Sequence, residues 1–336
     1  MKKKLTFLLI VLSVFLLSGC NLFKSDVMED ITVYTTTYPL NYLTNYLYKD
    51  HSTISSIYPN GINFKDYTIS DKKLTEFAKS DLFIFNSQDQ DRDYAVKMLN
   101  KNKNLLLIDS AMGMNYTNSL EELWLNPYNY LMMAKNIKDS LSEYITNPYL
   151  VEEISNNYEN LKYELSKLDA TYQDVLMNSS YKTIVADNVL FKFLEKYNVE
   201  VIVLQEEIKS ITIKEGQSIS DISKEYNVKV SDILTYNNKT DESVKAGEIV
   251  KIPIKVIENS DVNRVKKLIN DNEIRYIYSA NKETNSTVSN LVQSNNLELI
   301  TINDMYSVDG GVTNTNETYL TIMNDNLELF KKELCK

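Results

Sequence analysis

Short apolar runs alternate with amphipathic stretches along most of this chain, and the alternation limits the folds open to it. Continuous apolar runs such as "DLFIFN" (81–86) and "NLLLID" (104–109) are typical of parallel strands buried on both faces of a sheet. Between such runs lie helical segments, among them residues 70–80, where Ser70 is placed to cap the helix. Strands that alternate with helices predict βαβ units and therefore an α/β protein.

Two such series flank one long helical segment. The first series covers residues 31–146, and the second covers 180–210 and 256–336. In the segment between them, 147–179, apolar residues recur at spacings of three and four. Roughly thirty residues of helix would be about 45 Å long, enough to run along one face of a two-lobed protein.

The N-terminus has the features of a bacterial lipoprotein signal peptide over residues 1–19. Three lysines precede the thirteen-residue apolar run 5–17, which is too short to span a bilayer comfortably as a helix. The sequence "LSGC" (17–20) follows and resembles a lipobox, in which Cys20 becomes the lipidated first residue. We expect an extracytoplasmic protein anchored to the cell membrane through Cys20, with 20–30 as a tether. An ordinary signal peptide with a chance cysteine is the alternative.

An inserted segment, residues 211–253, interrupts the second α/β series. Its local pattern predicts strand, helix, helix, strand, and "KEGQSISDISKEYNV", "VSDILTYNN" and "AGEIVKIP" resemble a LysM module over its whole length. That resemblance implies binding of N-acetylglucosamine-containing glycans such as peptidoglycan. A purely structural insert is the alternative. The glycan groove would be lined by Gly216, Gln217, Ser218, Ile219, Tyr236, Asn237 and Asn238.

Composition excludes several classes of function. The net charge of −10 argues against binding to a nucleic-acid backbone, which needs concentrated Lys and Arg. His51 is the only histidine, so a histidine-based metal site or a Ser-His-Asp triad would have to be built from that single residue. No nucleophile–base pair, phosphate-binding glycine-rich loop or metal-hydrolase spacing is recognisable, and we expect no enzyme.

Outside the insert, the ordered motifs resemble the zinc/manganese-type solute-binding lipoproteins of bacterial ABC importers. The resemblance covers residues 31–210 and 256–334, and its motifs include "VYTTTYPLNYL", "YPNGINFKDYTIS", "ELWLNPYNYLMMAKNI" and "INDMYS". It implies two α/β lobes joined by one rigid helix, with a metal ion bound between the lobes. Its expected partners are a membrane permease and, through the LysM module, peptidoglycan.

The resemblance also implies four metal-ligand positions, which fall on Lys65, Glu122, Asp187 and Asp304. None of the four is histidine, although zinc prefers imidazole and thiolate ligands. Three carboxylates suit harder divalent cations such as Mn²⁺ better. Lysine is a poor ligand, because its amine is protonated near neutral pH.

We therefore expect the Lys65 ammonium to pair with the three carboxylates in place of tight transition-metal binding. Each position has a plainer interpretation: Lys65 in solvent, Glu122 in an acidic pair with Glu121, Asp187 as a helix cap, and Asp304 as a turn residue. The expected function is a metal-importer receptor for Zn²⁺, Mn²⁺ or another divalent cation. The alternative is a degenerate wall-associated structural or adhesion lipoprotein that carries no metal.

Overall fold

The structure is a computed structural model, and it describes residues 28–59, 61–62, 64–88, 90–280, 284–306 and 317–336. Cys20, the signal peptide and most of the tether lie outside the described residues. Within the described residues, no helix is both long and apolar enough to cross a membrane. The chain divides into two compact units and passes between them after Met114, within helix α6 (Pro127–Tyr144) and within helix α7 (Pro148–Met177).

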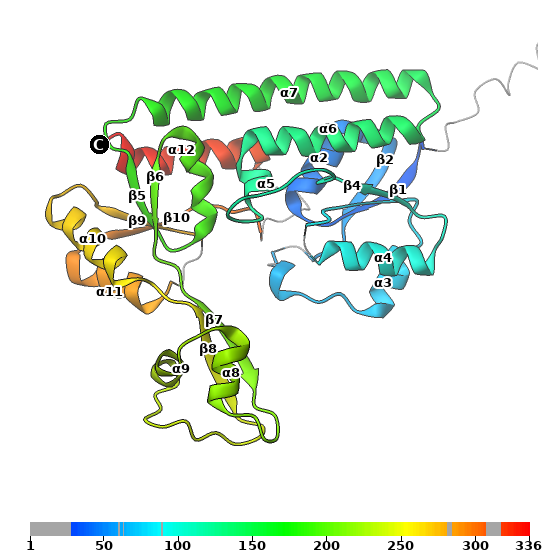
Figure 1. Ribbon diagram of the computed structural model, residues 1–336. Coiled ribbons are helices and arrows are strands. Elements are labelled where there is room, and N and C mark those ends of the chain that lie inside the picture. The colour runs from blue at the N-terminus through cyan, green and yellow to red at the C-terminus, as the bar shows by residue number, and fades with distance from the viewer. Residues whose placement is uncertain (1–27, 60, 63, 89, 281–283, 307–316) are drawn as a thin grey trace, which may run out of the picture. The chain divides into compact units, whose positions relative to one another are not determined.

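The first unit contains a four-stranded parallel sheet in the order β2-β1-β3-β4. Figure 1 shows α2 and α6 on one face of this sheet and α3 and α4 on the other. The elements of this region are β1 (Ile31–Thr35), α2 (Tyr38–Tyr48), β2 (Ser52–Ser56), η3 (Phe64–Asp66), α3 (Asp71–Phe77), β3 (Leu82–Phe85), α4 (Asp91–Lys101), β4 (Leu106–Asp109) and α6 (Pro127–Tyr144). The expected strands are confirmed, and Ser70 does cap α3 by accepting the Lys73 N–H.

The second unit repeats this topology with the sheet order β10-β9-β5-β6, also fully parallel. Apolar side chains from β5, β6 and β9 pack against those of α10 and α11. On the other side, the Phe330 ring of α12 contacts the rings of Phe191 and Tyr278. The elements are α5 (Glu122–Leu125), β5 (Thr183–Ala186), η4 (Val189–Tyr197), β6 (Glu200–Val203), α10 (Asn259–Asn270), β9 (Tyr276–Ser279), α11 (Ser286–Asn295), β10 (Glu298–Thr301) and α12 (Tyr319–Leu334).

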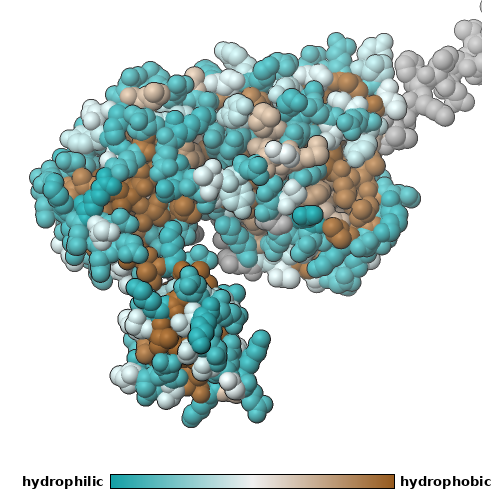
Figure 2. Space-filling model, viewed as in Figure 1, coloured by the Kyte–Doolittle hydropathy of each residue, from teal (hydrophilic) through white to brown (hydrophobic). Residues whose placement is uncertain are grey.

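Between β6 and α10 the chain forms a small element of its own, which we call the β7–β8 module. It comprises β7 (Glu207–Thr212), α8 (Ile219–Tyr226), α9 (Val230–Tyr236) and β8 (Ile249–Lys255). The strands pair antiparallel, and isoleucine and valine side chains from all four elements form a separate apolar core. Isoleucines also remain exposed on both strands, for example Ile249 at 68 %, and Figure 2 shows hydrophobic atoms on the module surface.

The structure corrects one boundary of the expected secondary structure. The segment after β5 is helical and forms the 3₁₀-type helix η4. The strand pair of the module starts at Glu207, four residues before the expected boundary at 211, because Glu207 pairs with Lys255. The strand–helix–helix–strand order is as expected.

Candidate functional site

Asp187 lies where the strand order of the second sheet reverses. β5 ends at Ala186 and its neighbour β9 ends at Ser279, and the next strands lie on opposite sides of this pair. The carboxyl ends of parallel strands at such a reversal are the usual ligand-binding position in open α/β sheets. The Ser279 hydroxyl donates to the Asp187 carboxylate, and the Asp187 N–H donates to the Tyr278 carbonyl at 2.9 Å.

Burial dominates the electrostatics of Asp187. It raises the pKa of this carboxyl above its usual range because desolvation disfavours the charged form. Hydrogen bonds from the Ser279 hydroxyl and the Ala280 backbone favour the carboxylate and offset part of the rise. A cation bound to this carboxylate would offset the cost of desolvating its charge.

The expected alternative role of Asp187 as a helix cap is wrong. Asn188 is the N-cap of η4, and its side-chain oxygen accepts the Leu190 N–H at 2.9 Å. Asp187 therefore points elsewhere, toward the end of β9 and its Ser279.

Glu122, in contrast, is fully engaged by the protein. It opens α5, is 8 % exposed, and accepts three hydrogen bonds from the preceding loop. The donors are the Thr117 N–H (3.0 Å), the Asn118 N–H (3.0 Å) and the Asn118 side-chain amide (2.8 Å). Both carboxylate oxygens hold backbone or amide donors, so this arrangement supports a structural role in closing the loop before α5.

The loop after β10 places Asp304 close to α5 within the second unit. The indole N–H of Trp124 donates to the Asp304 carbonyl at 3.0 Å, and the Trp124 and Tyr306 rings meet edge to face at 5.5 Å. The Asp304 carboxylate accepts the Tyr306 N–H at 3.0 Å, which gives it the turn role that we listed as its alternative. Met305 between them has φ of 65°, a left-handed conformation unusual for methionine.

Sequence reasoning considered Glu121 only as a neighbour of Glu122. In the structure Glu121 is 3 % exposed, and its carboxylate accepts a hydrogen bond from the Tyr306 hydroxyl. Nothing in the local spacing indicates this contact, since 185 residues separate the two side chains. The pair links α5 to the loop that carries Asp304.

These carboxylates are not assembled into a ligand group in the part of the chain that the structure describes. There, no set of three or more His, Cys, Asp or Glu side chains is placed to hold a metal ion. His51 pairs with Glu153 in the first unit, with Nε2 3.1 Å from the carboxylate. Glu122, Asp187 and Asp304 are each held by partners of their own.

Lys65 belongs to the first unit, on the 3₁₀ turn η3 that follows β2, and it is exposed. Its neighbour Phe64 anchors the turn: the ring is 2 % exposed and packs against Tyr58 at 5.6 Å. The Gln90 side chain also donates to the Phe64 carbonyl at 2.9 Å. The turn is therefore fixed by Phe64, which leaves Lys65 on its outer side.

The first expected glycan loop of the module is built largely for its own fold. Gly216 has φ of 75°, which suits glycine, and the Gln217 side chain accepts the Lys214 N–H at 3.1 Å. Ser218 forms a reciprocal capping box with Asp221 at the start of α8. Ile219 is fully buried, so its side chain belongs to the core and not to a ligand surface.

The second expected loop follows α9. The Asn237 side chain donates to the Ile233 and Lys251 carbonyls, both at 2.7 Å, and accepts the Lys251 N–H at 2.8 Å. Burial raises the pKa of Tyr236, and the carboxylate of Glu206 raises it further through its negative charge and by accepting a hydrogen bond from the Tyr236 hydroxyl. Asn238 adopts a left-handed conformation, with φ of 52°. Backbone and tyrosine contacts thus fix this loop.

A model for the family described as zinc-uptake complex component A, periplasmic (ZnuA), matches residues 33–251. The zinc-binding protein AdcA of Streptococcus pyogenes is 21 % identical in an alignment 310 residues long that covers 74 % of this chain and 59 % of AdcA. The chain thus spans less than two thirds of the length of the curated relatives it matches.

Solved structures share the fold. The Zn(II)-bound ZnuA-like domain of Streptococcus pneumoniae AdcA aligns with a TM-score of 0.63 at 18 % identity, covering 91 % of this chain and all of that domain. The metal-dependent lipoprotein YcdH of Bacillus subtilis aligns with a TM-score of 0.65 at 16 % identity, with the same coverage of this chain and all of YcdH. These alignments support the α/β fold with two parallel sheets.

Proposed function

Because the chain belongs to the ZnuA family of zinc-uptake proteins, we propose that it is the extracytoplasmic substrate-binding component of an ABC importer for a divalent transition metal. The family match over residues 33–251 carries the proposal. The two AdcA proteins named above are a zinc-binding protein and a Zn(II)-bound domain, so Zn²⁺ is the first cargo to test. A membrane permease would be the partner that receives the metal.

Asp187 is our first candidate for a protein ligand to the metal. Its carboxyl lies at the reversal point of the sheet and carries a raised pKa, so a cation would replace a proton that burial favours. Asp304 is the second candidate, although its carboxylate also holds the Tyr306 N–H. Glu122 is the weakest of the three, since three hydrogen bonds compete for its oxygens.

The candidate ligands Asp187, Asp304 and Glu122 are all carboxylates, which favours moderate affinity for a transition-metal ion. Carboxylates without imidazole or thiolate are a hard set, suited to Mn²⁺ at least as well as to Zn²⁺. We propose that Lys65, at a position that the family resemblance gives to a histidine, lowers metal affinity by contributing a fixed positive charge. Lys65→His should then bind Zn²⁺ more tightly than the unsubstituted protein.

Two further proposals concern where the protein resides. Its lipobox-like "LSGC" supports membrane anchoring through a lipidated Cys20. The order of elements and separate core of the β7–β8 module support a LysM-type glycan contact with peptidoglycan. Of the expected groove residues, Tyr236 and Gln217 retain partly exposed side chains, whereas Ile219 does not. Sedimentation with purified peptidoglycan, with and without residues 207–255, tests this contact.

Calorimetric titration of the metal-stripped protein with Zn²⁺ and Mn²⁺ tests the main proposal. We expect saturable binding of at least one ion, lost in Asp187→Ala and retained in the matched control Asp325→Ala, whose side chain is exposed on α12. Binding that survives Asp187→Ala would reject Asp187 as a ligand. No binding of either ion by the unsubstituted protein would favour the degenerate, non-transporting alternative.

A further inference from the structure

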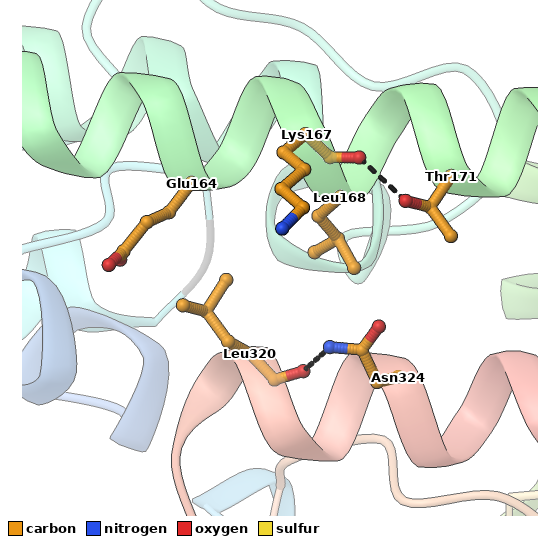
Figure 3. A pocket seen from close by; sticks show the side chains of 6 residues that line it. All are labelled: Glu164, Lys167, Leu168, Thr171, Leu320 and Asn324. Carbon is orange, nitrogen blue, oxygen red and sulfur yellow. Dashed lines mark hydrogen bonds between the residues drawn. The ribbon is translucent and has the colours of Figure 1, made fainter.

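A cavity of about 280 Å³ lies between the second half of α7 and helix α12, within the second unit. Figure 3 shows its six lining side chains, four from α7 and two from α12. They are Glu164, Lys167, Leu168, Thr171, Leu320 and Asn324. None of them belongs to the expected metal or glycan positions, so the proposed function leaves this cavity unexplained.

Glu164 contributes a carboxylate in which one oxygen lacks a hydrogen-bond donor among the described residues. That oxygen, Oε2, is buried. Buried polar atoms are nearly always paired, and leaving one unpaired costs about 1–3 kcal/mol, more for a charged group. Glu164 also lines the cavity and forms no ion pair among the described residues, so its carboxylate can receive a cationic N–H donor of a ligand.

Lys167 contributes the opposite charge without neutralising Glu164. In the part of the chain that the structure describes, it forms no ion pair, and Figure 3 shows its ammonium end in the space between the two helices. Five residues earlier on α7, the same Glu–Lys spacing gives a closed pair, with Lys162 Nζ 3.0 Å from Glu159 Oε2. Helix geometry therefore allows an ion pair at this spacing, although Glu164 and Lys167 do not form one.

The rest of the lining is apolar or already paired. Leu168 and Leu320 face the cavity from the two helices. The Thr171 hydroxyl donates to the Lys167 carbonyl at 2.8 Å, and the Asn324 amide donates to the Leu320 carbonyl at 2.7 Å. The charged chemistry offered to a ligand is therefore one carboxylate and one ammonium, beside an aliphatic wall and the side-chain oxygen of Asn324.

We propose that this cavity binds a small zwitterion of the amino-acid type with an aliphatic side chain. Its ammonium would bind Glu164, its carboxylate would bind Lys167, and its side chain would pack against Leu168 and Leu320. The volume is equivalent to roughly nine water molecules, which suits a single amino acid better than a drug-sized ligand. Two charge-assisted contacts of opposite sign would fix its direction in the cavity.

Calorimetric titration of the full chain with L-leucine, L-valine and L-methionine tests the proposal. We expect saturable binding of L-leucine, weakened about tenfold or more by Glu164→Gln and by Lys167→Gln, since each removes one charge-assisted contact. The matched controls are Glu159→Gln and Lys162→Gln, which have the same spacing on the same helix and should bind as the unsubstituted protein does. Unfolding curves of each variant report whether it is folded.

Two analogues keep the test independent of the variants. On the unsubstituted protein, 4-methylpentanoate lacks the ammonium and 3-methylbutylamine lacks the carboxylate, so each should bind about tenfold or more weakly than L-leucine. The proposal is overturned if none of the three amino acids binds, if Glu164→Gln leaves the affinity unchanged, or if either analogue binds as tightly as L-leucine. Metal titration reads out a different site, so the two proposals can fail separately.

Discussion

The start of α5 and the end of β5 each hold a carboxylate at an expected metal-ligand position, and the two sites differ in how the protein uses them. Glu122 accepts three N–H groups from the loop that precedes it. Asp187 has a raised pKa, because burial outweighs the hydrogen bonds that its carboxylate receives. A carboxylate whose oxygens accept hydrogen bonds from the protein stabilises the fold. A carboxylate whose charge is disfavoured by burial can instead be stabilised by a bound cation.

Glu122 and Asp187 both fall on ligand positions that the family resemblance implies, yet their contacts give them different chemical roles. Glu122 stands two residues before Trp124, whose indole N–H donates to the carbonyl of Asp304, another expected ligand position. The resemblance therefore identified neighbouring segments of the fold correctly. It could not distinguish a structural carboxylate from a binding one, because that difference depends on which N–H groups surround each side chain.

The largest expected effect is on stability, from Glu122→Ala. The substitution removes a nearly buried acceptor and leaves three donors of the preceding loop unpaired, so we expect the free energy of unfolding to fall by about 2–4 kcal/mol. Chemical denaturation measures it. Glu328→Ala is the control, because Glu328 forms an exposed pair with Lys331 and should change stability by less than about 1 kcal/mol. Equal losses in the two variants would show that the loop contacts of Glu122 carry no special weight.

Asp187→Asn should act in the opposite direction, with a smaller magnitude. A raised folded-state pKa means that Asp187 stabilises the fold when protonated, and that this contribution is lost as pH rises through the folded pKa. The neutral amide avoids that loss, so metal-free Asp187→Asn should be more stable than the unsubstituted protein at neutral pH. The advantage should vanish below pH 3.8, the ordinary pKa of this group.

Asp221→Asn supplies the contrasting measurement. The Ser218 hydroxyl and N–H hold the pKa of the Asp221 carboxyl below its usual range, so its charged form favours the fold. This variant should lose stability at neutral pH, and the loss should shrink as pH falls below 3.8. Denaturation curves between pH 3 and 7 follow both variants. If Asp187→Asn also lost stability at neutral pH, the assignment of Asp187 as a desolvated carboxyl would be wrong.

The sequence predicted the parallel strands, the long helix α7 and the element order of the β7–β8 module, because hydrophobic periodicity and caps are local signals. It missed contacts that depend on tertiary structure. Asn188 and not Asp187 caps η4, although both residue types are good caps and stand side by side. Ile219, an expected groove residue, is drawn into the module core by its position on α8.

The smallest effect is expected from Ser279→Ala. The Ser279 hydroxyl favours the charged form of Asp187, so its removal should raise the pKa of Asp187 further. Stability should change by less than about 1.5 kcal/mol, because a single hydrogen bond is lost. Metal binding should shift more clearly: a cation must displace a more tightly held proton, so affinity falls at mildly acidic pH and recovers as pH rises. Titrations with Zn²⁺ at several pH values measure this, and a pH-independent loss would assign Ser279 a purely structural role.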